Sequence, residues 1–294
     1  MSIAVIINPV AGGANPELAP ARAKMAATVL ERRGEAGDIL VTERPGHARE
    51  LARASVNRGV RLVVAWGGDG TINEIASELA FGDVPLAIIP SGSGNGLATE
   101  LGIDPNPERS LASAMNAAPS VIDLGEIGGR LFVNAAGIGI DAYVASQFNE
   151  SGNIRRGFRS YLKIGTRALF TYRPSTYRIV AGGTTVTSRA VLIAVANGAQ
   201  WGNGARIAPG ARLDDGRLDL VVVEEKSRVM TMVRTPRLFN GSIASAPGCS
   251  IRSVEIATIE CDDPMTFHVD GEPVRGGTTL TARVRPHALK LCVK

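Results

Sequence analysis

Residues 67–71 read Gly-Gly-Asp-Gly-Thr and lie between an apolar stretch and a helical pattern. Three glycines permit positive φ angles and let backbone N–H groups approach a phosphate closely. A helix that begins near Ile72 would add the partial positive charge of its N-terminus. A carboxylate beside phosphates would repel them unless it holds Mg²⁺, so Asp69 is a candidate magnesium ligand. The alternative is an ordinary turn between a strand and a helix.

Thr71 and Glu74 have the spacing of a capping box, S/T-x-x-E. In a capping box the two side chains satisfy backbone N–H groups where a helix begins. The spacing therefore predicts Thr71 as the residue that caps the helix.

Two more glycine-rich segments follow apolar stretches, at residues 8–13 (Asn-Pro-Val-Ala-Gly-Gly) and 91–96 (Ser-Gly-Ser-Gly-Asn-Gly). Ligands of open α/β sheets bind at the carboxyl ends of strands, so the three segments should converge on one crevice. Neither segment matches the P-loop pattern GxxxxGK[ST] or completes GxGxxG. A P-loop NTPase and a Rossmann dehydrogenase are therefore disfavoured.

The elements that must position these loops alternate in the first third of the chain. We expect strands at residues 3–7, 39–42, 60–66 and 85–89 and helices at residues 18–33, 48–57 and 72–79. Strands without polar alternation, separated by helices, are typical of a parallel sheet that is covered on both faces.

After Ile122 the pattern becomes β-rich, with one helical interruption at residues 158–170. We expect strands at residues 131–135, 177–181, 190–196, 218–223, 253–259, 265–269 and 280–284. Gly, Asn and Asp turns between such runs indicate an antiparallel sandwich or barrel. The predicted fold class is α/β plus all-β, with an α/β nucleotide-binding domain at 1–122, joined by a C-terminal strand at 285–294, and a β domain at 123–284.

Composition narrows the classes of partner and compartment. The chain of 294 residues has 4% aromatic residues and a net charge of +4. Few aromatic residues disfavour nucleic acid as a partner, and the mild positive charge is compatible with anionic substrates or membranes. No apolar run approaches the ~20 residues that span a bilayer. Three widely spaced cysteines predict a reducing cytoplasm, and His268, like the other two histidines, is interpreted as structural or as a surface residue.

The three loops, with Asn197-Gly198, residues 213–219 and Asp270-Gly271-Glu272-Pro273, resemble the diacylglycerol kinase catalytic domain family. The likeness covers essentially the whole chain in the expected order. The chain is similar to the compact bacterial lipid kinases, which are related to sphingosine and ceramide kinases. NAD kinases share only the Gly-Gly-Asp-Gly-Thr loop.

The resemblance implies a phosphofructokinase-like α/β domain, a C-terminal antiparallel β-sandwich and an active site in the cleft between them. It implies Glu272 as the catalytic residue, with Asp69 holding Mg²⁺–ATP, and a structural Mg²⁺ on Asp215, with Arg212 and Arg217 as backbone ligands. The residues implied to bind ATP are Asn8, Pro9, Val10, Ala11, Gly12, Thr42, Gly68, Asp69, Gly70, Thr71, Ile72, Asn73, Glu74 and Ser93.

The expected function is ATP-dependent transfer of the γ-phosphate to the hydroxyl of a lipid alcohol in phospholipid biosynthesis. Phosphoryl transfer needs positioning and charge neutralisation more than covalent chemistry. Glu272 would accept the hydroxyl proton, although Asp270-Gly271 alone predicts only a hairpin turn. Many bacterial diacylglycerol kinases carry Asn-Asp where this chain has Asn95-Gly96, which leaves a diacylglycerol-like or a sphingoid acceptor open. An NAD kinase-like enzyme and a non-catalytic nucleotide or lipid sensor are the alternatives.

Basic and apolar residues are mixed between Arg155 and Phe170, including Arg156 and Arg159. A short helix of this kind could lie on an anionic membrane surface, and the alternative is a helix packed on the β domain. We therefore expect a cytoplasmic protein with peripheral contact at the inner membrane face, and the sequence leaves a homodimer open.

Overall fold

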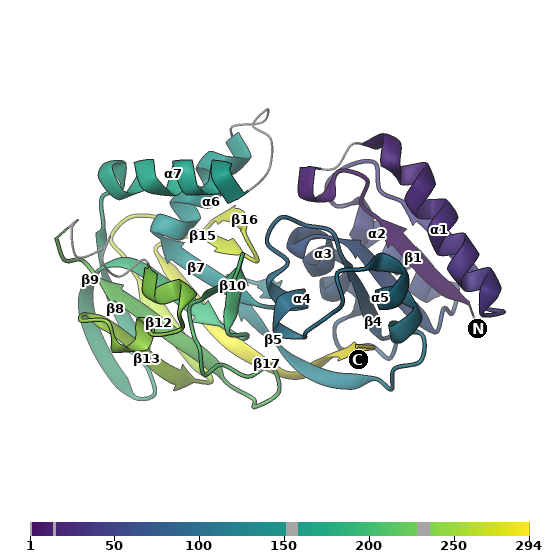
Figure 1. Ribbon diagram of the computed structural model, residues 1–294. Helices are drawn as coiled ribbons and strands as arrows, with labels where there is room; N and C mark the ends of the chain where they lie inside the picture. Colours follow the sequence, from purple (N-terminus) through teal and green to yellow (C-terminus); the bar gives the residue numbers. More distant parts are fainter. Residues whose placement is uncertain (1, 14–15, 151–157, 228–235, 294) are drawn as a thin grey trace. The chain divides into compact units, whose positions relative to one another are not determined.

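The computed structural model describes residues 2–13, 16–150, 158–227 and 236–293. The chain divides into two compact units, Met1–Ile122 with His287–Lys294 and Asp123–Pro286. The chain therefore passes from one unit to the other twice. Figure 1 shows the helices and strands of both units.

The first unit is built on a parallel sheet. Its strands are β1 (Ile3–Ile7), β2 (Gly37–Val41), β3 (Leu62–Gly67), β4 (Leu86–Pro90) and the end of β17 (Thr279–Leu291). They lie in the order β2-β1-β3-β4-β17, and β17 joins through the pair Leu291 and Leu86. β1 and β3 are buried along their whole length, as expected for strands covered on both faces. The predicted parallel sheet is confirmed.

Helices cover this sheet (Figure 1). They are α1 (Ala19–Arg32), α2 (His47–Asn57), α3 (Asp69–Leu79), α4 (Gly96–Glu100) and α5 (Pro107–Ala114). Alternate residues of β1 and β3 pack against apolar side chains of α1 and α5 in one core, whereas α2 contacts α3 and β1. The sequence did not predict α4 and α5, because they are short and one begins within a glycine-rich segment.

The second unit consists mainly of antiparallel strands. They are β5 (Ser120–Ile127), β6 (Arg130–Phe132), β7 (Ala135–Gly139), β8 (Ser175–Ala181), β9 (Thr184–Ala196), β10 (Gln200–Gly202), β11 (Ala205–Arg206), β12 (Leu218–Glu224), β13 (Cys249–Val254), β14 (Ile256–Glu260), β15 (Thr266–Val269), β16 (Glu272–Arg275) and most of β17. The long strand β9 pairs with β8 in its first half and with β7 and β12 in its second half. One large apolar core joins side chains from most of these strands. The predicted β-sandwich class is confirmed.

Two expectations for this unit were wrong. The run at residues 253–259 forms two strands, because β13 pairs with β12 whereas β14 pairs with β8 and β17, and the chain breaks at Glu255 to change partners. The sequence predicted one helix, but the structure has both α6 (Ile140–Glu150) and α7 (Phe158–Thr171). α6 packs on β15, β16 and β7.

Candidate active site

The three glycine loops of the first unit meet backbone to backbone. A Cβ atom added at Gly12, whose φ is +70°, would lie 2.4 Å from the carbonyl oxygen of Ser91. A Cβ added at Gly92 would lie 2.5 Å from the Cα of Gly68. Only glycine allows backbones to approach this closely. The predicted convergence of the three loops, which follow β1, β3 and β4, is confirmed within this unit.

Asn8 holds two of these loops together. Its Nδ2 donates to Thr71 Oγ1 at 2.8 Å, and its Oδ1 accepts from the backbone N–H of Val10 at 3.1 Å. The first contact ties the end of β1 to the first turn of α3, and the second shapes the turn that leads to Gly12. Asn8 therefore acts on the geometry of the loops through its side chain.

The predicted capping box is wrong. α3 begins at Asp69 with Gly68 as its N-cap, and no side chain caps it. Gly68 is extended, so the helix starts three residues earlier than expected and Thr71 lies inside the first turn. Backbone N–H groups of a first turn have no partner within the helix. This N-terminus therefore presents donors and a partial positive charge to an anion at the converging loops.

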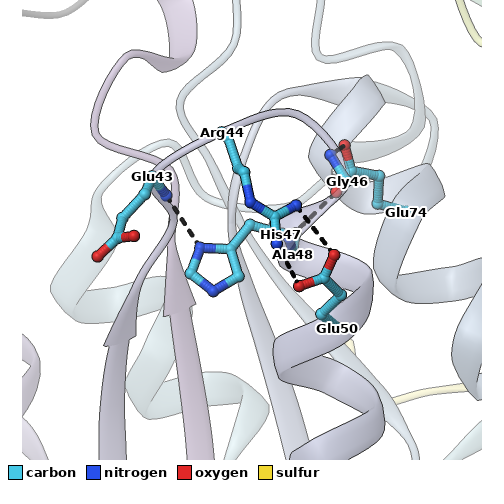
Figure 2. Close-up of polar contacts among 7 residues, drawn as sticks. All are labelled: Glu43, Arg44, Gly46, His47, Ala48, Glu50 and Glu74. Atoms are coloured by element: carbon cyan, nitrogen blue, oxygen red, sulfur yellow. Dashed lines mark hydrogen bonds and ion pairs between the residues drawn. The ribbon is translucent and has the colours of Figure 1, made fainter.

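Glu74 caps a different helix, as Figure 2 shows. Its carboxylate accepts from the backbone N–H groups of Gly46, at 2.9 Å, and Ala48, at 3.1 Å, where α2 begins. In the same segment His47 Nδ1 accepts from the backbone N–H of Glu43 at 3.1 Å. Glu74 thus fastens the segment that follows Thr42, so its carboxylate is committed to the protein backbone.

The other residues implied to bind ATP differ in their exposure: some are buried and some are partly or fully exposed. Thr42 follows β2 and its backbone N–H donates to the carbonyl of Ile7 at 2.9 Å. The side chains of Ile72 and Asn73 are buried, whereas Ser93 is exposed. The Asn73 side chain accepts from Ser77 Oγ at 3.4 Å. Asp69 is partly exposed as the first residue of this helix.

Arg22 is a candidate that the sequence did not reveal. It comes from α1, where its Nη1 donates to the carbonyl oxygen of Asn8 at 3.1 Å. Its guanidinium lies 5.8 Å from the centroid of the Trp66 ring, a cation–π contact. Burial lowers the pKa of Arg22, although an arginine remains charged. In an alanine-rich helix nothing in the spacing distinguishes this cation from a solvated one.

Glu272 lies at the end of a tight hairpin in the second unit. Asp270 and Gly271 have φ values of +46° and +86°, and Val269 pairs with Glu272 across the turn. Two left-handed residues between paired strands form a type I′ turn, which Asp-Gly favours. The predicted hairpin is confirmed, and it places Glu272, which is exposed, as the first residue of β16. Figure 1 labels this strand.

Asp270 anchors this hairpin. Its carboxylate accepts from the backbone N–H groups of Val133, Asn134 and Ala135 at 2.8, 2.9 and 3.1 Å. These N–H groups are at the break between β6 and β7. The expectation of one strand at 131–135 was therefore wrong, because Asp270 takes the donors that a continuous strand would give to a neighbour.

The segment implied to bind a structural metal is a turn before β12. Asp215 Oδ1 accepts from the backbone N–H of Arg217 at 3.0 Å, and the Arg217 side chain donates to Ser253 Oγ at 2.7 Å. Arg212 forms an ion pair with Asp214. Both guanidinium groups thus have protein partners, and only the backbone of these arginines is left to ligate a cation.

The carboxylates of Asp215 and Asp219 influence each other at this turn. Burial raises the pKa of Asp219, and the neighbouring Asp215 carboxylate raises it further. Two carboxylates that repel each other would be relieved by a bound cation. In the described ranges, however, no group of three or more His, Cys, Asp or Glu side chains could hold a metal ion.

The expected membrane-contact segment is only partly described. Arg155 and Arg156 lie outside the described residues, as does the side chain of Arg159. α7 covers Phe158–Thr171. Within the described part of the chain, no helix combines the length and the apolar character needed to cross a bilayer.

Comparisons with known proteins agree with this architecture. The family described as "Diacylglycerol kinase catalytic domain" matches residues 2–127. The family described as "YegS C-terminal NAD kinase beta sandwich-like domain" matches residues 134–293. The two matches correspond to an α/β unit with glycine loops followed by a β-sandwich unit, which is the class that the fold defines.

Relatives over most of the length carry the name "Probable lipid kinase YegS-like". One from Pseudomonas aeruginosa is 31% identical and covers 86% of this chain and 83% of its own. One from Chromohalobacter salexigens is 31% identical, with coverage of 80% and 77%. The chain therefore belongs to the family of YegS-like lipid kinases.

Solved structures support the fold. The crystal structure of a diacylglycerol kinase from Bacillus anthracis covers 100% of this chain and 97% of its own, with a TM-score of 0.74 and 20% identity. A second structure from the same organism reaches a TM-score of 0.80 at 21% identity, with coverage of 100% and 95%.

Proposed function

We propose that this protein transfers the γ-phosphate of ATP to the hydroxyl group of a lipid alcohol. The observation that carries the proposal is the meeting of three glycine loops at the uncapped N-terminus of α3, in a chain of a lipid kinase family. Backbone N–H groups and a helix N-terminus are suited to hold the phosphates of a nucleotide.

The first unit would bind the nucleotide. The loops that contain Gly12, Gly68 and Gly92 would donate backbone N–H groups to the phosphates, and Arg22 would add a fixed positive charge beside Asn8. Asp69 would hold Mg²⁺, which, when bound, neutralises charge on the transferring phosphate. The donor chemistry fits this ion, because a partly exposed carboxylate begins α3 beside the glycine loops.

The second unit would supply the proton acceptor. Glu272 begins β16 as an exposed carboxylate on an anchored two-residue hairpin. A carboxylate within reach of the lipid hydroxyl accepts its proton as the bond to phosphorus forms, a contribution of about 10²–10⁴-fold in rate. The reaction would therefore need the nucleotide held by one unit and Glu272 of the other.

The acceptor lipid is proposed as a class, either diacylglycerol-like or sphingoid. Asn95 Oδ1 accepts from the backbone N–H of Gly92 at 2.7 Å, and Asn95 Nδ2 donates to the carbonyl of Gly92 at 2.9 Å. Asn95, which the usual motif shares, thus works within its own loop. The position that departs from the motif is Gly96, which has no side chain, and it does not favour one acceptor. Peripheral contact with an anionic membrane surface is part of the proposal.

The test is transfer of radiolabelled phosphate from ATP to diacylglycerol, sphingosine, ceramide or NAD. We expect a labelled lipid, and Glu272→Gln should lower kcat about 10²–10⁴-fold with little change in KM for ATP. Glu255→Gln, which removes an exposed carboxylate of the same unit, should leave kcat unchanged. Transfer to NAD alone would contradict the lipid assignment, and full activity of Glu272→Gln would refute the proton acceptor.

A further inference from the structure

A histidine and an aspartate are buried together under the hairpin that carries Glu272. His268 Nε2 lies 3.0 Å from Asp141 Oδ2, and the two side chains are 5% and 2% exposed. Asp141 is in the first turn of α6, and its second oxygen accepts from the backbone N–H of Ala142 at 2.7 Å. Neither residue has a part in the transfer chemistry proposed above.

The strand beside His268 leaves room for this pair. Gly137 of β7 is directly opposite His268 of β15. A Cβ atom at Gly137 would lie 1.7 Å from Asp141 Oδ2 and 2.7 Å from His268 Nε2. A side chain at this position is therefore incompatible with the contact, and the glycine allows the carboxylate of α6 to reach the histidine across β7.

The other ring nitrogen of His268 holds the hairpin. The backbone N–H of Gly271 donates to His268 Nδ1 at 3.2 Å. Since Nδ1 accepts a hydrogen bond, it carries no proton, and a neutral imidazole must then carry its proton on Nε2. That proton points at the Asp141 carboxylate. The directions of both hydrogen bonds thus agree on one tautomer, which Asp141 selects.

We propose that Asp141 and His268 are positioning residues that orient Glu272 through the Gly271 peptide. The inference rests on the proposed role of Glu272 as proton acceptor. Gly271 precedes Glu272 directly, so an anchored Gly271 N–H sets the direction in which β16 begins. Glu272 is exposed, and the backbone of the hairpin sets where its side chain begins. A displacement of about 1 Å at a reacting group can cost about 100-fold in rate.

Two isosteric substitutions separate the two nitrogens of His268. In His268→Asn, the amide oxygen can take the place of Nδ1 and accept from Gly271, but the donor to Asp141 is lost. In His268→Gln, the amide nitrogen can take the place of Nε2 and donate to Asp141, but the acceptor for Gly271 is lost. His268→Asn therefore leaves the buried Asp141 carboxylate without its donor. His268→Gln removes the hydrogen bond that holds Gly271 and so releases the hairpin.

We therefore expect the less stable of the two variants to be the more active one. His268→Asn should have the lower unfolding midpoint and retain most of kcat. His268→Gln should be the more stable variant, with kcat reduced by up to about 100-fold and KM for ATP unchanged. A merely structural role predicts that kcat follows the unfolding midpoint in both variants, and this result would overturn the inference.

A glycine pair provides a matched comparison. Gly137→Ala should lower kcat as His268→Gln does, because the new Cβ displaces the Asp141 carboxylate. Gly210→Ala, in the same unit and with no atom within 4 Å of the added Cβ, should leave kcat unchanged. Equal kcat values in these two variants would count against the inference.

Nitrogen NMR of the unsubstituted protein tests the anchor without any activity. The His268 ring should show a protonated Nε2 and an unprotonated Nδ1, and the Gly271 amide should exchange slowly with solvent. A protonated Nδ1 would overturn the inference. If the anchor is present but the parent transfers phosphate to no lipid, the proposed function fails; if Glu272→Gln is inactive while His268→Gln is fully active, the positioning inference alone fails.

Discussion

At the residue scale, several polar side chains in the loops of each unit hydrogen-bond to backbone groups. Asn95 bonds both polar groups of Gly92, and Asp270 accepts three backbone N–H groups. Each carboxylate or amide supplies the hydrogen bonds that water would otherwise make to the backbone of the loop. Arg22 is a charged group beside the first of the glycine loops, where it donates to the carbonyl of Asn8.

The role of Arg22 can be tested by Arg22→Met, which keeps much of the apolar stem that lies on Trp66 and removes the charge. We expect KM for ATP to rise about tenfold or more, because a hydrogen bond to a charged group contributes roughly 1.5–3 kcal/mol. Steady-state kinetics with ATP as the varied substrate measures this change. Arg32→Met is the control from the same helix, since Arg32 pairs with Glu108 on the surface; an equal rise in both variants would contradict a specific role.

At the element scale, helix termini decide how the first unit is assembled. α3 has no side-chain cap, whereas α2 receives its cap from Glu74, one turn into α3. A carboxylate at a helix N-terminus is favoured by both hydrogen bonding and the helix dipole. Glu74 thus joins the loops after β2 and β3 by connecting the helices that follow them.

Glu74→Gln tests this connection, because an amide can offer only one acceptor oxygen to Gly46 and Ala48. We expect the free energy of unfolding to fall by about 1–2 kcal/mol, measured by urea denaturation. Glu50→Gln is the matched control on α2, where it removes only the exposed pair with Arg44 visible in Figure 2. Equal, small effects in both variants would show that Glu74 is not a structural cap.

At the scale of the whole molecule, the end of the chain completes the sheet of the first unit. The backbone N–H of Cys292 donates to the carbonyl of Leu86 at 2.8 Å, and that of Phe81 donates to the carbonyl of Ala288 at 2.7 Å. Leu289 and Leu291 are 1% and 0% exposed. A segment separated in sequence from residues 1–122 is thus part of their core.

Truncation after Pro286 should therefore unfold the first unit. Loss of a buried leucine costs about 2–5 kcal/mol, and two such residues approach the roughly 5–15 kcal/mol that stabilises a domain. The buried Trp66 reports on this unit by fluorescence if Trp201 of the second unit is replaced by Phe. Truncation after Val293 is the control, and an unchanged Trp66 transition in the shorter chain would contradict the expectation.

Patterns within a few residues were sufficient for much of the fold. Continuous apolar stretches predicted the parallel strands, and Asp270-Gly271 predicted the hairpin, because both depend on local backbone conformation and burial. The glycine loops predicted a phosphate site for the same reason. Boundaries failed where a strand changes partner, as at Glu255, since no local signal records which neighbour a strand will have.

The sequence by itself thus determined the class of each unit and the residues of the loops that lie at the ends of its strands. Only the tertiary structure decided the partners of single side chains: Asn8 with Thr71, 63 residues apart, and His268 with Asp141, 127 residues apart. The tertiary structure likewise decided that the Glu74 carboxylate caps α2. A side chain's type limits what it can bond, but its partner depends on which elements the packed core brings within 3 Å of it, a distance typical of hydrogen bonds.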